Sequence, residues 1–494
     1  MKKNTNKTIV IAGLMIGTFL TAIEGTVVST AMPKIIGDLQ GIRIMDWVFS
    51  IFMLTSAVTA PLFGKLADLF GRKAIFLIGI ILFLLGSVLC GLSWTMQAMI
   101  VFRGIQGIGA GAVMTLSTTI IGDIYPVEDR ARMFGMIGLI WGIAGILGPL
   151  VGGFFVDVLS WHWIFFINLP FGIVTILLVF LGLHEDWHQE RKKIDVTGAL
   201  VFAMAMISLL LALQRIGEHG WHDSLTMMLI IASFLLLGLF LFIEQRAEDP
   251  MVPLTLLKMP IVFLTNLFAL VASALLIGND IYMPMWLQGL LGYSATASGF
   301  VLTPMSLAWM AGSFLCGHLL SKLGLRKSEV FGAILLIIGT SLMAMLRVDS
   351  NHVIFYLLAT ILGLGFGITL TLTTIAAQSA TDHRMRGVIT ASNQFFRSIG
   401  QTIGAAFFGM YFNTQATHLI AEKNDDSVTV DQLNALVHPQ GHDQLHASLL
   451  NVLREVLNAC IHNLFVVFFI LALITGCIAM LLPKYLPNHS NQNV

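Results

Sequence analysis

The stretch GIGAGAVMTLST at residues 107–118 recurs, as a run of alternating glycines followed by hydroxyl residues, in GLGFGITLTLTT at residues 363–374. The two stretches are 256 residues apart. A second match, in the same order along the chain, joins GKL at 64–66 to GHL at 317–319 at an offset of 253. Two matches at nearly one offset indicate an internal duplication rather than a chance likeness between helices rich in small residues.

The composition places this duplication in a membrane. The chain has 494 residues, of which 56% are hydrophobic and 11% charged, and no water-soluble domain can bury that much apolar surface. The apolar runs are 20 or more residues long, whereas strands of a membrane barrel are about 10 residues and alternate. Because lipid offers the backbone no hydrogen-bond partners, such runs must be helices. The sequence therefore predicts an all-α integral-membrane protein embedded in a lipid bilayer.

The apolar runs predict fourteen membrane spans, and the offset of the duplication equals eight of them. The halves are then two pseudo-symmetric six-helix bundles of the same orientation, at 1–190 and 251–494, with a two-helix insert at 191–250. Such parallel repeats occur in transporters that rock two halves around a central site. A polar external loop is expected at about 413–456. The predicted spans are 8–33, 46–66, 74–94, 97–122, 132–157, 162–183, 196–214, 225–244, 260–289, 296–320, 328–346, 352–377, 388–412 and 457–483.

The basic residues predict the orientation of the chain. Loops on the side of the termini carry nineteen of the 27 Lys and Arg residues, and the opposite loops carry six. Cytoplasmic loops of membrane proteins show such an excess. We therefore expect a multi-pass protein of the cell membrane with both termini in the cytoplasm. The formal net charge is zero, so bulk electrostatics gives no reason to expect a nucleic-acid partner.

Four charged residues are predicted at membrane depth: Glu24, Arg103, Asp280 and Arg397. Each costs at least ~2.5–3.5 kcal/mol on insertion scales and therefore needs a reason. Glu24 and Asp280 are 256 residues apart, so they occupy equivalent places and should face one another across a central cavity. Glu24 and Arg103 have matching depths, which makes an ion pair feasible. Burial disfavours the carboxylate and a guanidinium favours it, so such an acid can load and release protons near neutral pH.

For each of these residues a purely structural role stays open, as an ion pair that holds helices together. The repeat position of Arg103 is Ala359, so Asp280 lacks an equivalent cation, and Arg397 is its candidate partner. Arg397 also belongs to a polar stripe on one face of its helix. Such a face lines a cavity or forms hydrogen bonds between helices. The predicted substrate-cavity residues are Gln106, Trp141, Asn279, Asn393, Gln394 and Arg397.

These features resemble the major facilitator superfamily, and within it the fourteen-span drug:proton antiporters, over nearly the whole chain. GKLADLFGRK at 64–73 resembles the family's loop motif between spans 2 and 3. Its glycines allow a tight turn, and its Asp can bind a helix N-terminus or an arginine. The resemblance implies a conformational latch made of Gly64, Asp68, Gly71, Arg72 and Lys73.

Two more stretches resemble motifs of this family. RGIQGIG at 103–109 is similar to the span 4 motif, whose arginine, here Arg103, is implicated in proton coupling. GPLVGG at 148–153 resembles the antiporter motif of span 5, with Ala144 where a glycine is expected. Small residues in this motif permit close helix approach, and its proline bends the helix. The residues implied are Gly148, Pro149, Gly152 and Gly153.

Two signatures point to the fourteen-span group. IEGTVVSTAMP at 23–33 is similar to its span 1 signature, which usually carries Asp where this chain has Glu24. The longer arm keeps the charge, so proton handling should survive while the geometry shifts. WHW at 161–163, followed by FINLP at 166–170, resembles another signature, in which Arg is more usual than His162. We expect His162 to be a solvated histidine.

The sequence and the resemblance together predict an exporter that exchanges cytoplasmic drugs or other amphipathic compounds, cationic ones included, for external protons. Glu24 and Asp280 are the expected proton carriers, no cofactor beyond the proton gradient is implied, and a monomer is expected. The sequence contains neither a G-x-x-x-x-G-K-[ST] loop nor an H-E-x-x-H site, so neither an enzyme nor ATP-driven pumping is predicted. Two alternatives stay open: an exporter of one antibiotic, metabolite or lipid, and a membrane receptor or scaffold that transports nothing.

Overall fold

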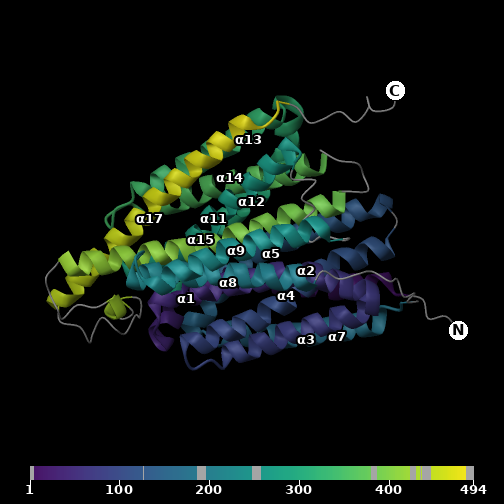
Figure 1. Ribbon diagram of the computed structural model, residues 1–494, viewed down its shortest axis with the longest axis horizontal. Helices are drawn as coiled ribbons and strands as arrows, with labels where there is room; N and C mark the ends of the chain where they lie inside the picture. The colour runs from purple at the N-terminus through teal and green to yellow at the C-terminus, as the bar shows by residue number, and fades with distance from the viewer. Residues whose placement is uncertain are drawn as a thin grey trace. The chain divides into compact units, whose positions relative to one another are not determined.

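The structure is a computed structural model of the chain (Figure 1). It describes residues 5–125, 127–185, 196–247, 258–379, 386–422, 430–433, 436 and 447–484.

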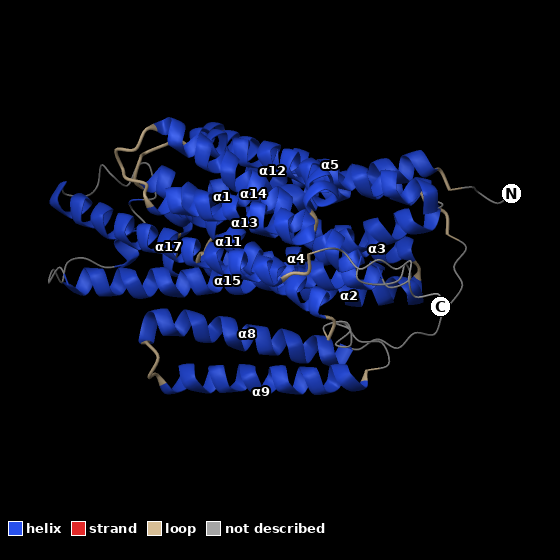
Figure 2. Cartoon of the chain, turned by 90° about the horizontal axis from the view of Figure 1, so that it is seen from above, coloured by secondary structure: helices blue, strands red, loops and turns tan. Residues whose placement is uncertain are grey.

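Helices are the regular elements of these described ranges (Figure 2). Each of the fourteen predicted spans coincides with a helix, α6 and α7 together forming the sixth. The helices are α1 Lys7–Leu39, α2 Asp46–Phe70, α3 Arg72–Gly91, α4 Met96–Ile124, α5 Val127–Val158, α6 Trp163–Phe166, α7 Asn168–Gly182, α8 Val196–His219, α9 Ser224–Arg246, α11 Pro260–Gly289, α12 Ala295–Leu323, α13 Leu325–Ala344, α14 His352–Ser379, α15 Arg386–Glu422 and α17 Ala447–Leu481, with short 3₁₀ turns at Ile42–Ile44 and Val430–Gln432.

In the described part of the chain, thirteen of these helices are long and apolar enough to cross a membrane. The exception is α15, which covers the predicted span 388–412 but carries the polar stripe with Gln394, Arg397 and Gln401. A stripe of polar residues lowers the mean hydropathy of a helix without shortening it. The protein is an all-helical, multi-pass integral-membrane protein.

The loop predicted at about 413–456 begins and ends within helices, and its external location stays a prediction. A non-helical stretch at about 413–456 is wrong at both ends, because α15 continues to Glu422 and α17 begins at Ala447. Hydropathy detects only the part of a helix that is apolar, and a helix that projects into water changes its composition without ending.

Equivalent glycines join equivalent helices in the two halves. Gly71, with φ 91°, separates α2 from α3, and Gly324, with φ 77°, separates α12 from α13. Positive φ of this size favours glycine, because a side chain there meets the backbone. The two glycines are 253 residues apart, which is the offset of the second sequence match. The duplication therefore extends to the conformation of this turn.

Contacts divide the chain into two compact units. Unit 1 contains Met1–Met251, Pro284–Phe300 and Ala406–Leu457. Unit 2 contains Val252–Met283, Val301–Ala405 and Asn458–Val494. Four of the five cuts fall inside helices, namely α11, α12, α15 and α17, so the predicted domains 1–190, 191–250 and 251–494 stay predictions.

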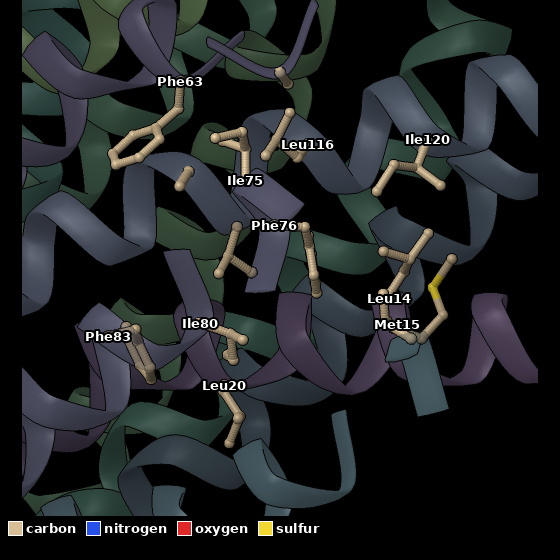
Figure 3. Close-up of a cluster of buried hydrophobic side chains, with 14 of the residues drawn as sticks. Leu14, Met15, Leu20, Phe63, Ile75, Phe76, Ile80, Phe83, Leu116 and Ile120 are labelled. Carbon is tan, nitrogen blue, oxygen red and sulfur yellow. The ribbon is translucent and has the colours of Figure 1, made fainter. Parts of the chain in front are cut away.

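The core of unit 1 is an apolar cluster between its first helices (Figure 3). Phe76, Ile80 and Phe83 share one face of α3 and are fully buried. They meet Leu20 of α1 and Leu116 of α4. α8 and α9 lie side by side as a hairpin (Figure 2), and α8 packs on α2. The interior of unit 1 is thus closed by apolar packing, and any charge inside it must find its partners there.

Candidate functional site

An ion pair lies inside unit 1. Nη1 of Arg103, on α4, is 2.7 Å from Oε1 of Glu24, on α1. Both side chains are 0% exposed. An unpaired charge in such a place costs several kcal/mol even after relaxation, so each of these residues depends on the other. The ion pair that the matching depths predict is confirmed, whereas the role of the pair in proton coupling stays a prediction.

The second carboxylate oxygen of Glu24 is held by Asn168. Nδ2 of Asn168, at the start of α7, donates to Oε2 of Glu24 at 2.8 Å and to Oγ of Ser87 at 2.9 Å. Asn168 is part of the FINLP signature, but that pattern gives it no role. Nothing local could have done so, because Asn168 lies 144 residues from Glu24. The carboxylate therefore has a charged donor on one oxygen and a neutral donor on the other.

Arg103 has further partners in the same buried site. Its Nη1 donates to Oε1 of Gln106 at 2.9 Å, and its Nε donates to the carbonyl of Val48 at 3.2 Å. Its guanidinium lies over the ring of Phe52, with 4.1 Å to the ring centroid, which is a favourable cation–π position. Gln106 is 0% exposed and therefore belongs to the ion-pair site rather than to an open cavity in this structure.

Asp280 has different surroundings from its predicted counterpart. It is partly buried on α11, and Nδ2 of Asn279 lies 3.5 Å from its Oδ1. Arg397 is partly buried on α15, and within the described residues it makes no ion pair with Asp280. Asp280 thus has no cation beside it in the part of the chain that the structure describes. Its role as a proton carrier stays a prediction.

The remaining predicted cavity residues fall into two groups. Trp141 is 44% exposed and Gln394 is exposed, whereas Asn279 and Asn393 are buried. Nδ2 of Asn279 contacts Sδ of Met305 at 3.4 Å. Asn393 bridges three helices: it donates to Oδ1 of Asn266 at 3.1 Å on α11 and accepts from Thr374 at 3.2 Å on α14. Hydrogen bonding between helices, the open alternative, accounts for Asn393.

The loop motif forms a charged cluster at the start of α3. Oε1 and Oε2 of Glu185 accept hydrogen bonds from the backbone N–H groups of Arg72 at 2.9 Å and Lys73 at 3.1 Å. A carboxylate is favourable at a helix N-terminus, where N–H groups lack partners. The Arg72 side chain pairs with Asp123, and Nζ of Lys73 donates to the carbonyl of Phe180 at 2.7 Å.

Glu185 and Asp123 therefore hold the end of the loop motif, and no sequence pattern pointed to either residue. The side chain of Asp68, the predicted latch acid, lies outside the described residues. Gly64 is partly buried on α2. A cavity of about 340 Å³ opens beside this cluster, and its polar lining residues are Thr5, Lys7, Arg72, Asp123, His184 and Glu185.

The antiporter motif packs α5 against α1. A Cβ added at Gly148 would overlap Oγ1 of Thr26, and one added at Gly152 would overlap Oγ1 of Thr30. Oγ1 of Thr26 also lies 3.4 Å from the carbonyl of Ala144, the residue that departs from the family pattern. Pro149 lies inside α5, as predicted. The close helix approach expected of these small residues is confirmed.

The same motif also meets the start of α12 within unit 1. Gly153 lies against the backbone of Thr296, and Gly299 lies against the carbonyl of Pro149. One turn after Gly153, the carboxylate of Asp157 accepts from the N–H groups of Ala295 at 3.2 Å and Thr296 at 2.8 Å. An α5 carboxylate thus caps α12, in addition to the glycine contacts.

His162 differs from the expected solvated histidine. Its ring stacks on Trp161, with 3.7 Å between the ring centroids, and its Nδ1 lies 3.2 Å from Oγ of Ser160. Burial lowers the pKa of His162 below its ordinary value, with Asp38 opposing the shift. The ring is therefore neutral at pH 7, and the histidine supplies packing rather than charge.

Gly148→Ala is expected to destabilise the protein by about 1–3 kcal/mol, because the new methyl group forces α1 and α5 apart. The measurement is thermal unfolding of the purified protein in detergent. Gly122→Ala is the matched control, since a Cβ at that helical glycine meets nothing within 4 Å. Equal melting temperatures for the two variants would contradict the close contact between α1 and α5.

Comparisons with known proteins agree with this architecture. The model of the Major Facilitator Superfamily matches residues 14–405. The chain is 35% identical to the multidrug transporter protein MdtP of Bacillus subtilis, over 85% of this chain and 78% of that protein. It is 30% identical to the rubrofusarin-specific efflux pump aurT of Gibberella zeae, over 96% of this chain and 88% of that pump.

A solved structure shows the same fold. The crystal structure of a bacterial homologue of the human lysosomal transporter Spinster, inward-facing and occupied, matches with a TM-score of 0.70 at 16% identity, over 97% of both chains. A likeness at that identity concerns the fold alone. The family model and the relatives cover most of the chain, including α1, α4 and α5 with their motifs, and the chain therefore belongs to the major facilitator superfamily of membrane transporters.

Proposed function

We propose that this transporter exports drugs or other amphipathic small molecules from the cytoplasm, in exchange for protons, by alternating access. Two kinds of observation support the proposal. The relatives include a multidrug transporter and an efflux pump that match nearly the whole chain. The observation that carries the coupling to protons is the fully buried Glu24 carboxylate, which has Arg103 on one oxygen and Asn168 on the other.

Protonation of Glu24 connects the proton to a change of conformation. A proton on the carboxylate removes the negative charge and leaves Arg103 buried without a counter-ion. Breaking a buried pair in this way costs ~3–5 kcal/mol, so the arrangement seen here becomes unfavourable once the proton binds. Gln106 and the Val48 carbonyl keep the guanidinium hydrogen-bonded but supply no charge. The strain is relieved when the helices move and water reaches Arg103.

The direction of exchange follows from the proton gradient. Protons enter from outside, and a membrane potential of 100 mV supplies ~2.3 kcal/mol per charge moved. Since each ~1.4 kcal/mol is a factor of ten, one proton sustains about a fortyfold gradient of an uncharged substrate. A cationic substrate can replace the proton as the partner of a carboxylate, which makes the two binding events alternative and gives exchange.

A narrow substrate range is the second candidate. The match to aurT favours it, because that pump is described as specific for rubrofusarin and covers 96% of this chain. The remote alternative, a receptor or scaffold that transports nothing, is set aside because the chain belongs to a transporter family.

Proton flux in vesicles tests the proposed function. The purified full chain is reconstituted into lipid vesicles with a pH-sensitive dye inside, and a panel of chemically unrelated amphipathic compounds is added one at a time. We expect several compounds to move protons in the direction opposite to their own. A response to one compound alone would support the narrow exporter, and transport of a compound without any proton movement would overturn antiport.

A further inference from the structure

Glu329 is a buried acid that the proposed coupling does not use. It lies on α13, four residues after the first residue of the helix, and its side chain is 0% exposed. Neither carboxyl oxygen has a hydrogen-bond partner in the described part of the chain. Glu24, by contrast, is equally buried but has a donor on each oxygen.

Glu329 was not among the charges predicted at membrane depth. It is the second residue of the predicted span 328–346 and follows Arg326 and Lys327 closely, so it reads as the end of a span next to a basic loop. The available signal is helix periodicity: Glu329 shares a face with apolar and small positions. The buried positions of this face are Leu325, Ser328, Glu329, Gly332, Ala333, Leu336, Gly339, Thr340 and Met343.

The surroundings of Glu329 contain no countercharge in the described residues. Cys316 of α12 lies within electrostatic reach, and it belongs to an apolar cluster with Ile368 and Leu372 of α14. No Asp, Glu, Lys or Arg occurs in α14.

Charged and titratable side chains on the packed elements point elsewhere. Nε of Arg326 donates to the carbonyl of Leu482 at the end of α17. Lys327 is exposed on α13, as are His318 and Lys322 on α12. These exposed groups are hydrated, and water weakens their attraction for a buried carboxylate. Among the described residues, an ionised Glu329 would have neither a hydrogen bond nor a paired charge.

The fold does not need an acid at this place. Glu329 lies five residues after Gly324, and in the first half Phe76 lies five residues after the equivalent Gly71. Phe76 is also buried and packs in the apolar core of unit 1. Because a buried, unpaired carboxylate is far more costly than a phenylalanine, an acid here points to a use other than packing.

We propose that Glu329 is a proton-binding site of the second half, loaded in the structure described here and able to exchange its proton with the cytoplasm. The Cα atom of Glu329 lies about 6 Å along the helix axis from the first residue of α13, at 1.5 Å per residue. A dry surrounding favours the neutral acid. Once water enters, the positive end of the helix favours the carboxylate. Wetting of this end of α13 therefore releases the proton and drying rebinds it.

Proton release on denaturation tests whether Glu329 is protonated in the folded protein. The full chain is unfolded with a strong detergent at pH 7 in weak buffer, and the released protons are counted with an indicator dye. A neutral Glu329 ionises when it becomes exposed, so Glu329→Gln is expected to release about one proton fewer per chain than the wild type. Equal release from the two proteins would overturn the proposal. Asp223→Asn is the matched control, since Arg215 and a backbone N–H of α9 keep Asp223 ionised in the folded chain and its loss leaves the count unchanged.

Exchange with the cytoplasm is tested by transport. In vesicles with the cytoplasmic face towards a buffer of varied pH, wild-type transport should change with the pH on that side, and Glu329→Gln should flatten this dependence. If Glu329→Gln releases one proton fewer on denaturation but keeps the wild-type pH profile of transport, the proposed exchange of that proton with the cytoplasm is wrong. Glu329 would then be a protonated residue with a structural role. The denaturation experiment needs no substrate, so it stands even if drug-driven proton flux is not found.

Discussion

Glu24→Gln is expected to reduce drug-driven proton movement to the background rate. The amide cannot take up and release a proton, and it leaves Arg103 buried beside a neutral partner. The variant therefore resembles the protonated form of the transporter permanently, which favours the conformation that follows proton binding. The measurement is proton flux in vesicles on addition of a transported compound, together with the accessibility of cysteines introduced on the two sides of the membrane.

Asp280→Asn is the control for this experiment, because it removes an acid that has no ion pair in the described residues. If Asp280→Asn exchanges normally while Glu24→Gln does not, the coupling proton belongs to the first half. If Glu24→Gln exchanges drug for protons like the wild type, the assignment of Glu24 as the carrier is wrong.

Arg103→Leu is expected to cost ~3–5 kcal/mol of stability, because it leaves the Glu24 carboxylate buried without its charged partner. The guanidinium also makes bonds to Gln106 and Val48 and a contact with Phe52, all of which the leucine loses. The measurement is the unfolding of purified protein by heat or denaturant in detergent. Transport should be lost as well, since the carboxyl would then stay protonated.

A double-mutant cycle separates the two effects. Glu24→Leu combined with Arg103→Leu replaces the pair by apolar side chains, which is often neutral or stabilising for a buried pair, so most of the lost stability should return. Transport should not return, because no carrier acid is left at this place. Full activity in the double variant would mean that another acid carries the coupling proton, and Asp280 and Glu329 are the candidates. A fully stable single variant Arg103→Leu would contradict the ion pair itself.

Different parts of the site were predictable for different reasons. The pairing of Glu24 with Arg103 followed from depth in the membrane, which the number of residues from each helix end determines. Arg397 was only a candidate partner of Asp280, and the two do not pair in the described residues. Asn168 and Glu185 could not be assigned, because each binds its partner across more than 100 residues of chain and neither carries a helix-depth signal. The burial of Glu329 could have been predicted from helix periodicity, but its basic neighbours Arg326 and Lys327 made the position resemble the end of a span.

The sequence by itself determined the class of the protein, its helices, its duplication and its glycine contacts. These properties depend on transfer of apolar runs into lipid and on local backbone sterics, and both act over one helix or one turn. Only the tertiary structure decided which polar groups complete the buried site and which buried acid has no hydrogen-bond partner among the described residues. That outcome depends on the rotation of each helix about its own axis, which side-chain packing between distant segments sets. Two acids of equal burial, Glu24 and Glu329, thus differ because packing brings a guanidinium to one, whereas the other has no hydrogen-bond partner in the described residues and lies near the Cys316 thiol.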